Sequence, residues 1–323
     1  MIYLDHASTP PMRPEVWEAM APFASVSFGN PSGVHGVSRA AKNALEEARE
    51  KIAGLIGAQP LEVVFTSGGT ESDNLAIKGA VLSSTPGQCL VTSAIEHEAV
   101  LETADFLKRL GLPVTIVGVD SEARAHPDEI AAAVNDDTAV VSVMTVNNET
   151  GTVQDIGAIS DMVKRKSPET LMHTDAVQAF GSEQIDVGAL GIDLMTISAH
   201  KFGGPKGAGI LYVREGIALE PVLHGGGQEL GRRSGTHDVA SAVGMATAVE
   251  SALSDRHRFE TEIRAIRDRL EERFVADALD VVVNTPKMGR SSHHLNVRFP
   301  GVRNETLLML LDQKGVAASA GSA

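Results

Sequence analysis

A lysine and an aspartate each follow a short apolar run in this sequence, and no other feature constrains the fold as strongly. Lys201 ends the motif Ser198-Ala199-His200-Lys201 after the run Leu194–Ser198, and Asp175 follows the run Thr170–Thr174. Apolar runs of this length are typical of buried strands. Open α/β sheets bind their ligands outside the carboxyl ends of such strands. The pair therefore predicts a ligand site at one edge of a sheet.

These two side chains suit one cofactor especially well. Pyridoxal phosphate needs an amine that forms a Schiff base with its aldehyde, and a carboxylate that keeps its pyridine nitrogen protonated. Lys201 would supply the amine and Asp175 the carboxylate. Taken singly, each residue has a simpler interpretation: a surface lysine at a strand end, and an aspartate that caps the next helix.

Short apolar runs alternate with helical patterns up to about Thr236, which indicates a mainly parallel sheet with crossover helices. The expected strands are Leu61–Thr66, Cys89–Ser93, Val114–Val119, Ala139–Val146, Thr170–Thr174, Leu194–Ser198 and Gly209–Val213. The connection between the last two is too short for a helix, so they should pair antiparallel. The predicted class is α/β, with a seven-stranded, mainly parallel sheet between helices such as Arg39–Ile56.

The pattern changes after Thr236. The elements expected there are helices at Val239–Leu253, Arg258–Leu279 and Glu305–Gln313, and strands at Val281–Asn284 and His294–Phe299. Asn304 should cap the last helix and Gly315 should stop it. We therefore expect a large cofactor-binding domain over residues 15–250 and a smaller α+β domain made of 1–14 and 251–323. Because chains seldom stop inside a connection, the ending Ser319–Ala323 suggests that this small domain is incomplete.

Composition excludes several classes of partner. The formal charge of −14 argues against nucleic acid or an anionic membrane as the main partner. No apolar run is long enough to span a membrane, and Met1–Asp5 lacks the basic and apolar regions of a signal peptide. The single cysteine, Cys89, excludes an intrachain disulfide framework and fits a reducing cytoplasm, which is the expected location.

Other motifs give weaker signals. Ser67-Gly68-Gly69-Thr70-Glu71-Ser72 lies between a strand and a helix, so it is either a phosphate-binding turn or an ordinary capped turn. The glycine-rich run Gly203–Gly209 precedes a strand and lacks the ending of a nucleotide-binding loop. No metal site is expected, because His293 and His294 are adjacent on a predicted strand and should point to opposite faces.

The placement of the candidates decides between these interpretations. His97, which could be a capping or core histidine, follows the strand Cys89–Ser93. Lys201, Asp175 and the turn Ser67–Ser72 also follow strands. If these strands are parallel, their carboxyl ends meet in one crevice, and a shared site becomes the better interpretation of all four features.

The chain resembles the cysteine desulfurases of the class V aminotransferase family, which have the pyridoxal-phosphate fold-type I scaffold. The resemblance runs nearly end to end, and its motifs occur in one order: Tyr3–Pro10, Phe28–Ser32, Ser67–Asn74, Glu96-His97, Val146–Gly151, His173–Gln178, Ser198–Lys201 and Arg233–Thr236. So many matches in one order are highly specific for the family.

The resemblance implies a role for each matching residue. Lys201 matches the Schiff-base lysine, Asp175 the partner of the pyridinium nitrogen, and His97 the histidine that stacks on the ring and assists proton transfer. Gln178 and Asn148 match residues close to the phenolic oxygen of the ring. The residues that match the phosphate cradle are Gly69, Thr70, Ser198 and His200.

Two further implications concern what lies outside one copy of this chain. Thr236 matches a phosphate contact from a second subunit, which implies a homodimer with shared active sites. The family's nucleophilic cysteine follows a Ser-x-Gly-Ser-Ala run, so it would come directly after Ala323, with the arginine for the substrate carboxylate further on. Cys89 cannot replace that cysteine, because it begins a buried strand away from the crevice.

The resemblance implies a reaction: L-cysteine becomes L-alanine, and persulfide sulfur passes to an iron–sulfur scaffold or another acceptor protein. Three alternatives remain open at this point. The chain could be a selenocysteine lyase, a small-amino-acid aminotransferase, or a non-catalytic family member that is truncated at Ala323. The Ser319–Ala323 run favours the desulfurase.

Overall fold

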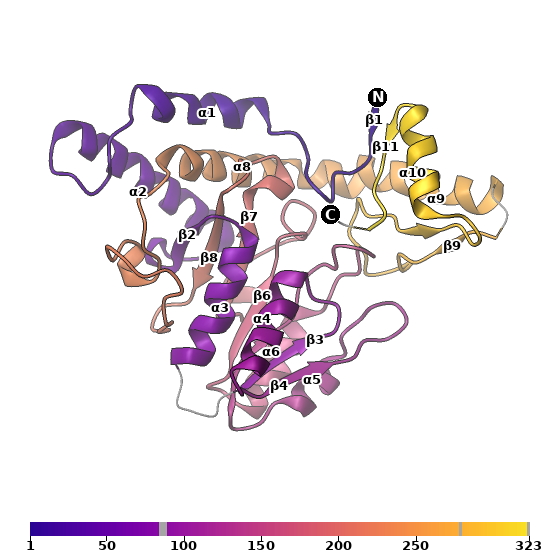
Figure 1. Cartoon of the computed structure of the whole chain (residues 1–323), viewed down its shortest axis with the longest axis horizontal. Coiled ribbons are helices and arrows are strands. Elements are labelled where there is room, and N and C mark those ends of the chain that lie inside the picture. Colours follow the sequence, from indigo (N-terminus) through magenta and orange to yellow (C-terminus); the bar gives the residue numbers. More distant parts are fainter. Residues whose placement is uncertain (84–88, 278–279, 322–323) are drawn as a thin grey trace.

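A seven-stranded sheet forms the centre of the computed structural model, which describes residues 1–83, 89–277 and 280–321 (Figure 1). The strands lie in the order β2-β8-β7-β6-β5-β3-β4. Their bounds are β2 Val63–Thr66, β3 Cys89–Ser93, β4 Val114–Val117, β5 Thr138–Ser142, β6 Leu171–Asp175, β7 Leu194–Ser198 and β8 Gly209–Val213.

Six of these strands run in one direction. β3, β4, β5, β6 and β7 pair in parallel, whereas β8 is antiparallel to both of its neighbours, β7 and β2. Ser198 is opposite Gly209, and Gly209 is in turn opposite Thr66. The carboxyl ends of β2, β3, β5, β6 and β7 therefore lie along the same edge of the sheet.

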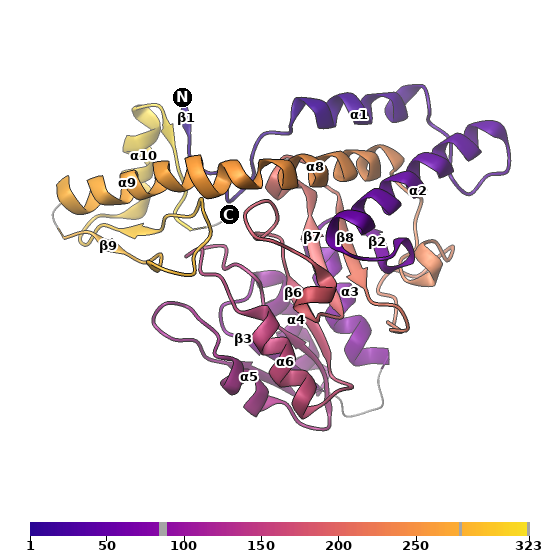
Figure 2. The ribbon, with the colours of Figure 1, turned by 180° about the vertical axis from the view of Figure 1, so that it is seen from behind.

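Helices cover both faces of the sheet (Figures 1 and 2). One face packs on α2 (Gly36–Ile56), α5 (Pro127–Ala133), α6 (Ile156–Lys166) and α8 (Val239–Arg258), and the other on α3 (Gly69–Ser83) and α4 (Glu98–Arg109). Neighbouring residues of a strand face opposite cores: in β8, Ile210 packs into the first and Leu211 into the second. Strands buried on both faces explain the continuous apolar runs in the sequence.

Helix α2 shows how capping residues set the ends of a helix and how apolar residues set its buried face. In α2, the ring of His35 accepts a hydrogen bond from Ser38 N, and Leu45 and Ile52 are buried one above the other. Gly57, with φ of 77°, ends this helix in the left-handed conformation. A buried leucine or isoleucine contributes about 1.5–3 kcal/mol, so the stripe fixes which face of α2 meets the sheet.

A long helical rod crosses the molecule beside the sheet (Figure 2). It consists of α8, a single π-helical segment η4 (Phe259–Ile263) and α9 (Arg264–Asp277). The remaining elements are α1 Pro14–Ser25, α7 Val187–Leu190, α10 Asn304–Gln313, the pair β1 Ile2–Tyr3 with β11 Val316–Ala317, and the pair β9 Val282–Val283 with β10 Val297–Arg298. Short 3-10 segments occur at η1 Pro60–Glu62, η2 Ala199–Phe202 and η3 Glu229–Gly231. Within 1–83, 89–277 and 280–321, no helix is long and apolar enough to cross a membrane.

The predicted sheet is confirmed, including the antiparallel pairing of Leu194–Ser198 with Gly209–Val213. The predicted strand Ala139–Val146 was too long: beyond Ser142 the chain still donates from Thr145 N to Asp175 O, but it then turns back at the Val146–Val153 bridge. The predicted His294–Phe299 strand is similarly reduced to Val297–Arg298.

Two details of the helices also differ from expectation. Asn304 is the first residue of α10 rather than its cap, because the chain enters the helix at Arg303, whose side chain makes no capping bond. Gly315 follows the end of this helix with φ of 77°, as a stop signal should. The expected helix Arg258–Leu279 continues α8 through the π-helical segment, and its last two positions, 278–279, lie outside the described residues.

Gly209 in β8 has no room for a side chain. A Cβ atom there would lie 2.6 Å from Gly68 Cα and 2.9 Å from Ile197 O, both backbone atoms that cannot rotate away. The absence of a side chain at residue 209 therefore lets the turn after β2 approach β8 closely.

Gly209→Ala should destabilise the fold by about 1–3 kcal/mol, because the methyl group must displace backbone. Gly54→Ala is the matched control: this exposed position in α2 has no atom within 4 Å of the added carbon, and the change should stabilise the helix by about 0.5–1 kcal/mol. Urea unfolding of both variants measures the difference. A Gly209→Ala protein as stable as the wild type would show that the turn is not held against β8.

Candidate active site at the carboxyl edge of the sheet

The expected site residues lie where the parallel strands end. The turn Ser67–Thr70 follows β2, His97 follows β3, and Asn148 follows β5. Asp175 is the last residue of β6, and Ser198 is the last residue of β7. Strand direction therefore brings these segments to one edge, as the sequence predicted.

Lys201 lies in the short η2 turn directly after β7. Its Nζ donates hydrogen bonds to the carbonyl oxygens of Ala7 and Ser8, both at 2.9 Å. Burial lowers the pKa of this amine, while the carboxylates of Asp175 and Asp5 partly oppose the shift. An amine that gives up its proton more readily is a better nucleophile towards a carbonyl group.

The segment that holds Lys201 comes from near the N-terminus of the chain. Ala7 O also accepts a hydrogen bond from Gln178 Nε2 at 2.9 Å, and Thr9 Oγ1 lies 3.2 Å from His200 Nδ1. The sequence showed a motif at Tyr3–Pro10 but no role for it. Contacts across almost two hundred residues leave no periodic signal, so only the motif itself could have pointed to this segment.

Asp175 and His97 are electrostatic neighbours. Asp175 Oδ1 accepts a hydrogen bond from Val177 N at 2.8 Å. Burial raises the pKa of Asp175, whereas this amide and the charges of His97 and Lys201 lower it. His97 caps α4, because its Nδ1 accepts from Ala99 N at 3.0 Å. A ring that accepts a hydrogen bond at Nδ1 carries its proton on Nε2.

The turn after β2 packs against the end of β7. Gly68 has φ of 146°, and a Cβ atom on Gly69 would lie 3.0 Å from Val177 Cγ2 and 3.5 Å from Ser198 Cβ. The turn leads into the first residues of α3, where Thr70 is exposed. Free amides at a helix start attract anions, so this turn has the character of a phosphate cradle. His200 is half-buried, and its pKa is lowered to about 4 by burial and by Lys201 and Lys206.

Two buried carboxyl groups lie near Asp175. Among the described residues, Asp73 Oδ1 and Glu96 Oε2 are buried without a hydrogen-bond partner. Burial and the charge of Asp175 raise the pKa of Asp73 well above its usual value, and burial raises the pKa of Glu96 to about 8. Of the three groups, Asp175 is the one whose pKa is lowered by neighbouring basic groups, His97 and Lys201, so it carries the negative charge while Asp73 and Glu96 hold protons.

The remaining predicted residues are placed differently. Gln178 is buried and bonded to the N-terminal segment, and Asn148 is half-buried in the turn after β5. Thr236 is exposed on the loop between β8 and α8. Cys89 is buried at the start of β3, 3.4 Å from Thr138 Oγ1, which is the opposite end of the strand from His97.

The C-terminal run lies beside the N-terminal segment. Ser319 Oγ donates to Asp5 Oδ1 at 2.7 Å, and an added Cβ on Gly321 would lie 2.7 Å from Glu149 Oε2. Asp5 is one of the charges that act on Lys201. The last two residues of the expected Ser319–Ala323 loop, 322–323, lie outside the described residues.

His293 and His294 do not lie on a strand, so the prediction that they point to opposite faces of one was wrong. His293 lies in a bend and His294 directly follows it, and their ring centroids are only 4.3 Å apart. Ser291 Oγ bonds to His294 Nδ1 at 2.5 Å, which holds the ring inward. Over residues 1–83, 89–277 and 280–321, no three potential ligands gather into a metal site.

The donors at this edge fit pyridoxal phosphate. Lys201 offers an amine of lowered pKa, Asp175 offers a buried carboxylate, and the Gly68-Gly69 turn opens on a helix start where a phosphate group can bind. Val177 and Ser198 approach Gly69 closely enough that a larger side chain would fill the turn. The chemistry of the donor set thus matches the three functional parts of that cofactor.

Comparisons with known proteins agree with this chemistry. The sequence matches the family described as aminotransferase class-V over residues 2–323. It is 45% identical over 323 residues to the cysteine desulfurase IscS of Dictyoglomus turgidum, covering 100% of this chain and 82% of that protein. Among solved structures, it is similar to a NifS-like protein with a TM-score of 0.95 and 38% identity, covering 98% of this chain and 87% of the other. A structure described as SspA in complex with cysteine has a TM-score of 0.87 and 36% identity, and the match covers 100% of this chain and 90% of the other.

Glu96→Gln should make the protein more stable at high pH. A carboxyl group whose folded pKa is raised stabilises the fold fully below about pH 4.5, and this contribution is lost as the pH rises through about 8. The amide cannot ionise, and its oxygen can still accept from Met144 N as Glu96 Oε1 does at 3.0 Å.

The measurement is urea unfolding at about pH 5 and about pH 9. At pH 5 the two proteins should have similar free energies of unfolding. At pH 9 the free energy of unfolding of Glu96→Gln should exceed that of the wild type by on the order of 1–3 kcal/mol. Glu98→Gln, at an exposed position two residues away, is the control, and its free energy of unfolding should change with pH as that of the wild type does. Parallel behaviour of Glu96→Gln and wild type at both pH values would mean that Glu96 is ionised in the folded protein.

Proposed function

The chain belongs to the aminotransferase class-V family, and from that premise we propose that it is a cysteine desulfurase. Such an enzyme converts L-cysteine to L-alanine and passes the sulfur to an acceptor. Membership of the family implies pyridoxal phosphate as the cofactor. When bound, this cofactor withdraws electrons from the Cα atom of an amino acid.

The observation that carries the proposal is the placement of Lys201 and Asp175 at one edge of the sheet, each influencing the other's charge. Lys201 would hold the cofactor through its aldehyde and would carry the proton of the substrate Cα atom. Asp175 would keep the ring nitrogen protonated, and His97 would contact the ring and assist proton transfer. The other proposed cofactor contacts are Gly69, Thr70, Asn148, Gln178, Ser198, His200 and, from a second copy, Thr236.

The acceptor and the assembly are part of the same proposal. We propose a homodimer that works in the cytoplasm, takes L-cysteine as substrate, and hands persulfide sulfur to an iron–sulfur scaffold or another acceptor protein. Residues 15–250 would form the cofactor-binding domain, and 1–14 with 251–323 the smaller one. The contact of Ser319 with Asp5 supports a sulfur-carrying loop at the mouth of the site.

Lys201 is expected to be the cofactor attachment point. Protein loaded with pyridoxal phosphate should be yellow, and borohydride reduction should fix the label on the peptide that contains Lys201. Lys206, five residues along in the glycine-rich turn, serves as the internal control. Label on Lys206, or on any other lysine, would show that the amine is misassigned.

The desulfurase activity is tested with L-cysteine and a thiol reductant. A chain extended past Ala323 by a segment that begins with cysteine and includes the expected arginine should release alanine and sulfide in equal amounts. Replacing that added cysteine by serine should stop the reaction. Asp175→Asn in the extended chain should slow it by several orders of magnitude, each factor of ten being ~1.4 kcal/mol of barrier, because a neutral amide cannot keep the ring nitrogen protonated.

The alternatives give other results in the same assay. Sustained alanine release by the 323-residue chain itself would overturn the loop-cysteine mechanism and favour a lyase. A keto acid in place of alanine would indicate an aminotransferase. Cofactor binding without turnover by the extended chain would indicate a non-catalytic member.

A further inference from the structure

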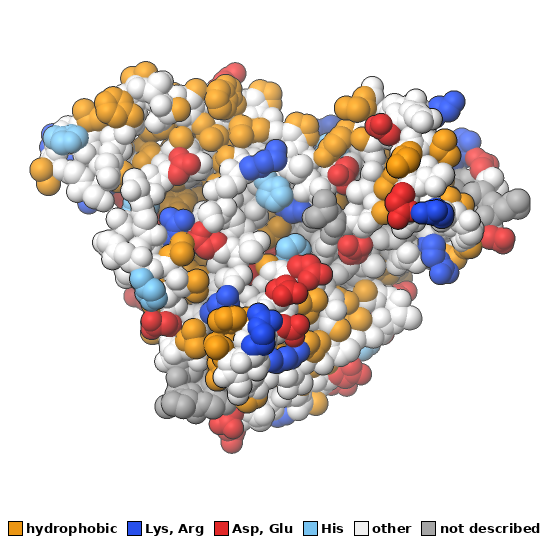
Figure 3. Space-filling model, viewed as in Figure 1, with side chains coloured by type: hydrophobic (Ala, Val, Ile, Leu, Met, Phe, Trp, Pro, Cys, Tyr) orange, Lys and Arg blue, Asp and Glu red, His pale blue; other side chains and the backbone are white. Residues whose placement is uncertain are grey.

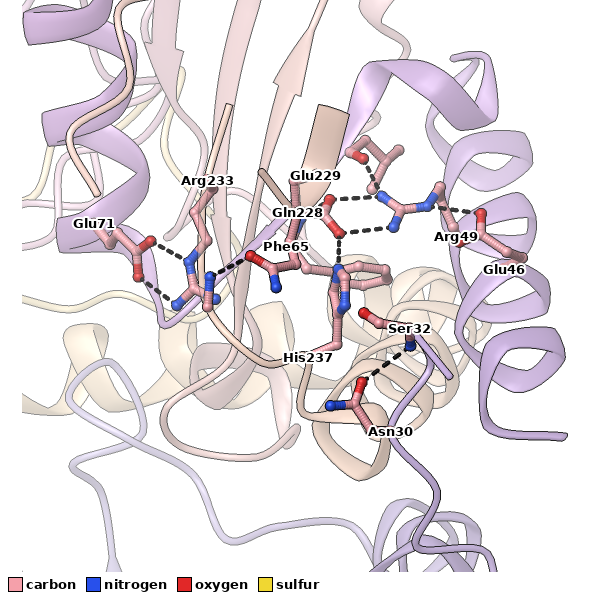
Figure 4. A network of polar contacts seen from close by, with 12 residues as sticks. Asn30, Ser32, Glu46, Arg49, Phe65, Glu71, Gln228, Glu229, Arg233 and His237 are labelled. Carbon is pink, nitrogen blue, oxygen red and sulfur yellow. Dashed lines mark hydrogen bonds and ion pairs between the residues drawn. The ribbon is translucent and has the colours of Figure 1, made fainter. Parts of the chain in front are cut away.

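The loop between β8 and α8 carries the motif Arg233–Thr236 and is held by two anchors (Figure 4). The first is Glu229, which points towards Arg49 of α2, and the second is Arg233, which points towards Glu71 of α3. The exposed Thr236 lies just beyond both anchors along the chain.

The Glu229 carboxylate is the centre of the first anchor. Glu229 is only 7% exposed, and Arg49 binds it with both Nη atoms, each at 2.8 Å. Phe65 N donates to it at 3.0 Å and His237 Nε2 at 2.6 Å. These donors lower the pKa of Glu229 to about 2 against the effect of burial. Paired, charge-assisted hydrogen bonds of this kind are the strongest that side chains make.

The backbone at this anchor is strained. Glu229 has φ of 50° and Leu230 has φ of 58°, so two successive residues with side chains adopt the left-handed conformation. Such a conformation costs on the order of 1–3 kcal/mol for each residue, and it persists only where the surroundings impose it. The hydrogen bonds to the Glu229 carboxylate supply that constraint.

The second anchor locks the motif itself. Arg233 Nε donates to Glu71 Oε1 at 2.7 Å, and Glu71 also accepts from Ser67 N at 2.8 Å. Gln228 Oε1 accepts from Gly235 N at 2.9 Å. The residues on both sides of the strained turn are therefore tied together, and the position of Thr236 follows from them.

Apolar and charged side chains lie side by side on the surface around this loop (Figure 3). Leu230 is 70% exposed and Leu61 is 67% exposed, and both line one hollow together with Arg232 and His237. Arg232 Nη1 donates to Leu61 O at 3.0 Å, which keeps the loop beside that leucine. Within one copy of the chain, the exposed Leu230 side chain buries little apolar surface to offset the strain of its turn. Contact with a second copy would bury this surface.

We propose that Glu229 is a positioning residue that acts in trans: it fixes Arg233–Thr236 in the shape that completes the cofactor phosphate site of a second copy. This inference rests on the proposed function, in which Thr236 contacts the phosphate group of the partner's cofactor. Glu229 touches neither cofactor nor substrate and acts through the loop.

The test measures how fast the yellow protein loses its cofactor to an excess of a scavenger that binds the free aldehyde form of the cofactor. Glu229→Gln dimers should lose it about 5- to 30-fold faster than wild type, the effect of one or two kcal/mol. Thr236→Ala should behave similarly. Glu250→Gln makes the same charge change at an exposed ion pair with Lys51 and should leave the rate unchanged.

Mixed dimers then separate action in trans from action in cis. One subunit carries Lys201→Ala and gives no yellow band, and the other carries Glu229→Gln. The only coloured site therefore combines Lys201 of the Glu229→Gln subunit with the loop of the Lys201→Ala subunit, whose Glu229 is intact. Release from this site should be as slow as in the wild type. Fast release would show that Glu229 serves its own site and would overturn the proposal.

Two further measurements keep the outcomes distinct. If Glu229→Gln does not fold, His237→Gln removes one of the hydrogen bonds to the same carboxylate and should give a smaller acceleration that is rescued in the same mixed dimer. The absence of rescue there would also overturn the proposal. Sedimentation of the wild type tests the premise separately: a monomer that retains its cofactor would contradict the shared sites of the proposed function rather than the role of Glu229 alone.

Discussion

Strand direction determines where Lys201, Asp175, His97 and the turn Ser67–Thr70 lie. β2, β3, β5, β6 and β7 end along one edge, so the residues that follow them meet although they are far apart in the sequence. The exception, β8, is equally important. Because it runs antiparallel between β7 and β2, Gly209 lies opposite both Ser198 and Thr66, and the phosphate-type turn packs directly against the segment of Lys201.

Bringing these groups together places several carboxyl groups close to one another, and protonation of some of them removes the repulsion between negative charges. Three carboxyl groups, those of Asp73, Glu96 and Asp175, lie within electrostatic reach of one another in a buried region. Three unscreened negative charges there would be very costly. His173, whose pKa burial lowers to about 3, is neutral and cannot compensate them. A single charge, on Asp175 beside Lys201 and His97, is the arrangement that the contacts favour.

Local patterns were sufficient to predict the sheet and the placement of Lys201, Asp175, His97 and the turn Ser67–Ser72 along its edge, whereas Asn148 and Gln178 were found only through the family resemblance. Apolar runs located Cys89–Ser93, Leu194–Ser198 and Gly209–Val213, and strand ends pointed to Lys201 and Asp175. The errors and omissions concern tertiary contacts. No pattern links Glu229 with Arg49, or the carbonyl oxygens of Ala7 and Ser8 with Lys201. The bend at His293 and His294 likewise depends on Ser291 and on packing rather than on periodicity.

The pairing of β1 with β11 has a consequence for biosynthesis. Ile2 N donates to Gly315 O and Leu4 N to Ala317 O, and Asp5 is bonded to Ser319, 314 residues further along the chain. On the ribosome the central sheet can assemble long before residue 315 emerges, because domains fold as units during synthesis. The pairing of β1, the strand that precedes Ala7 and Ser8, must wait until Val316 and Ala317 have been made. The N-terminal segment therefore gains its last contacts only after residue 319 has been made, so the wall of the crevice beside Lys201 takes its final form late in folding.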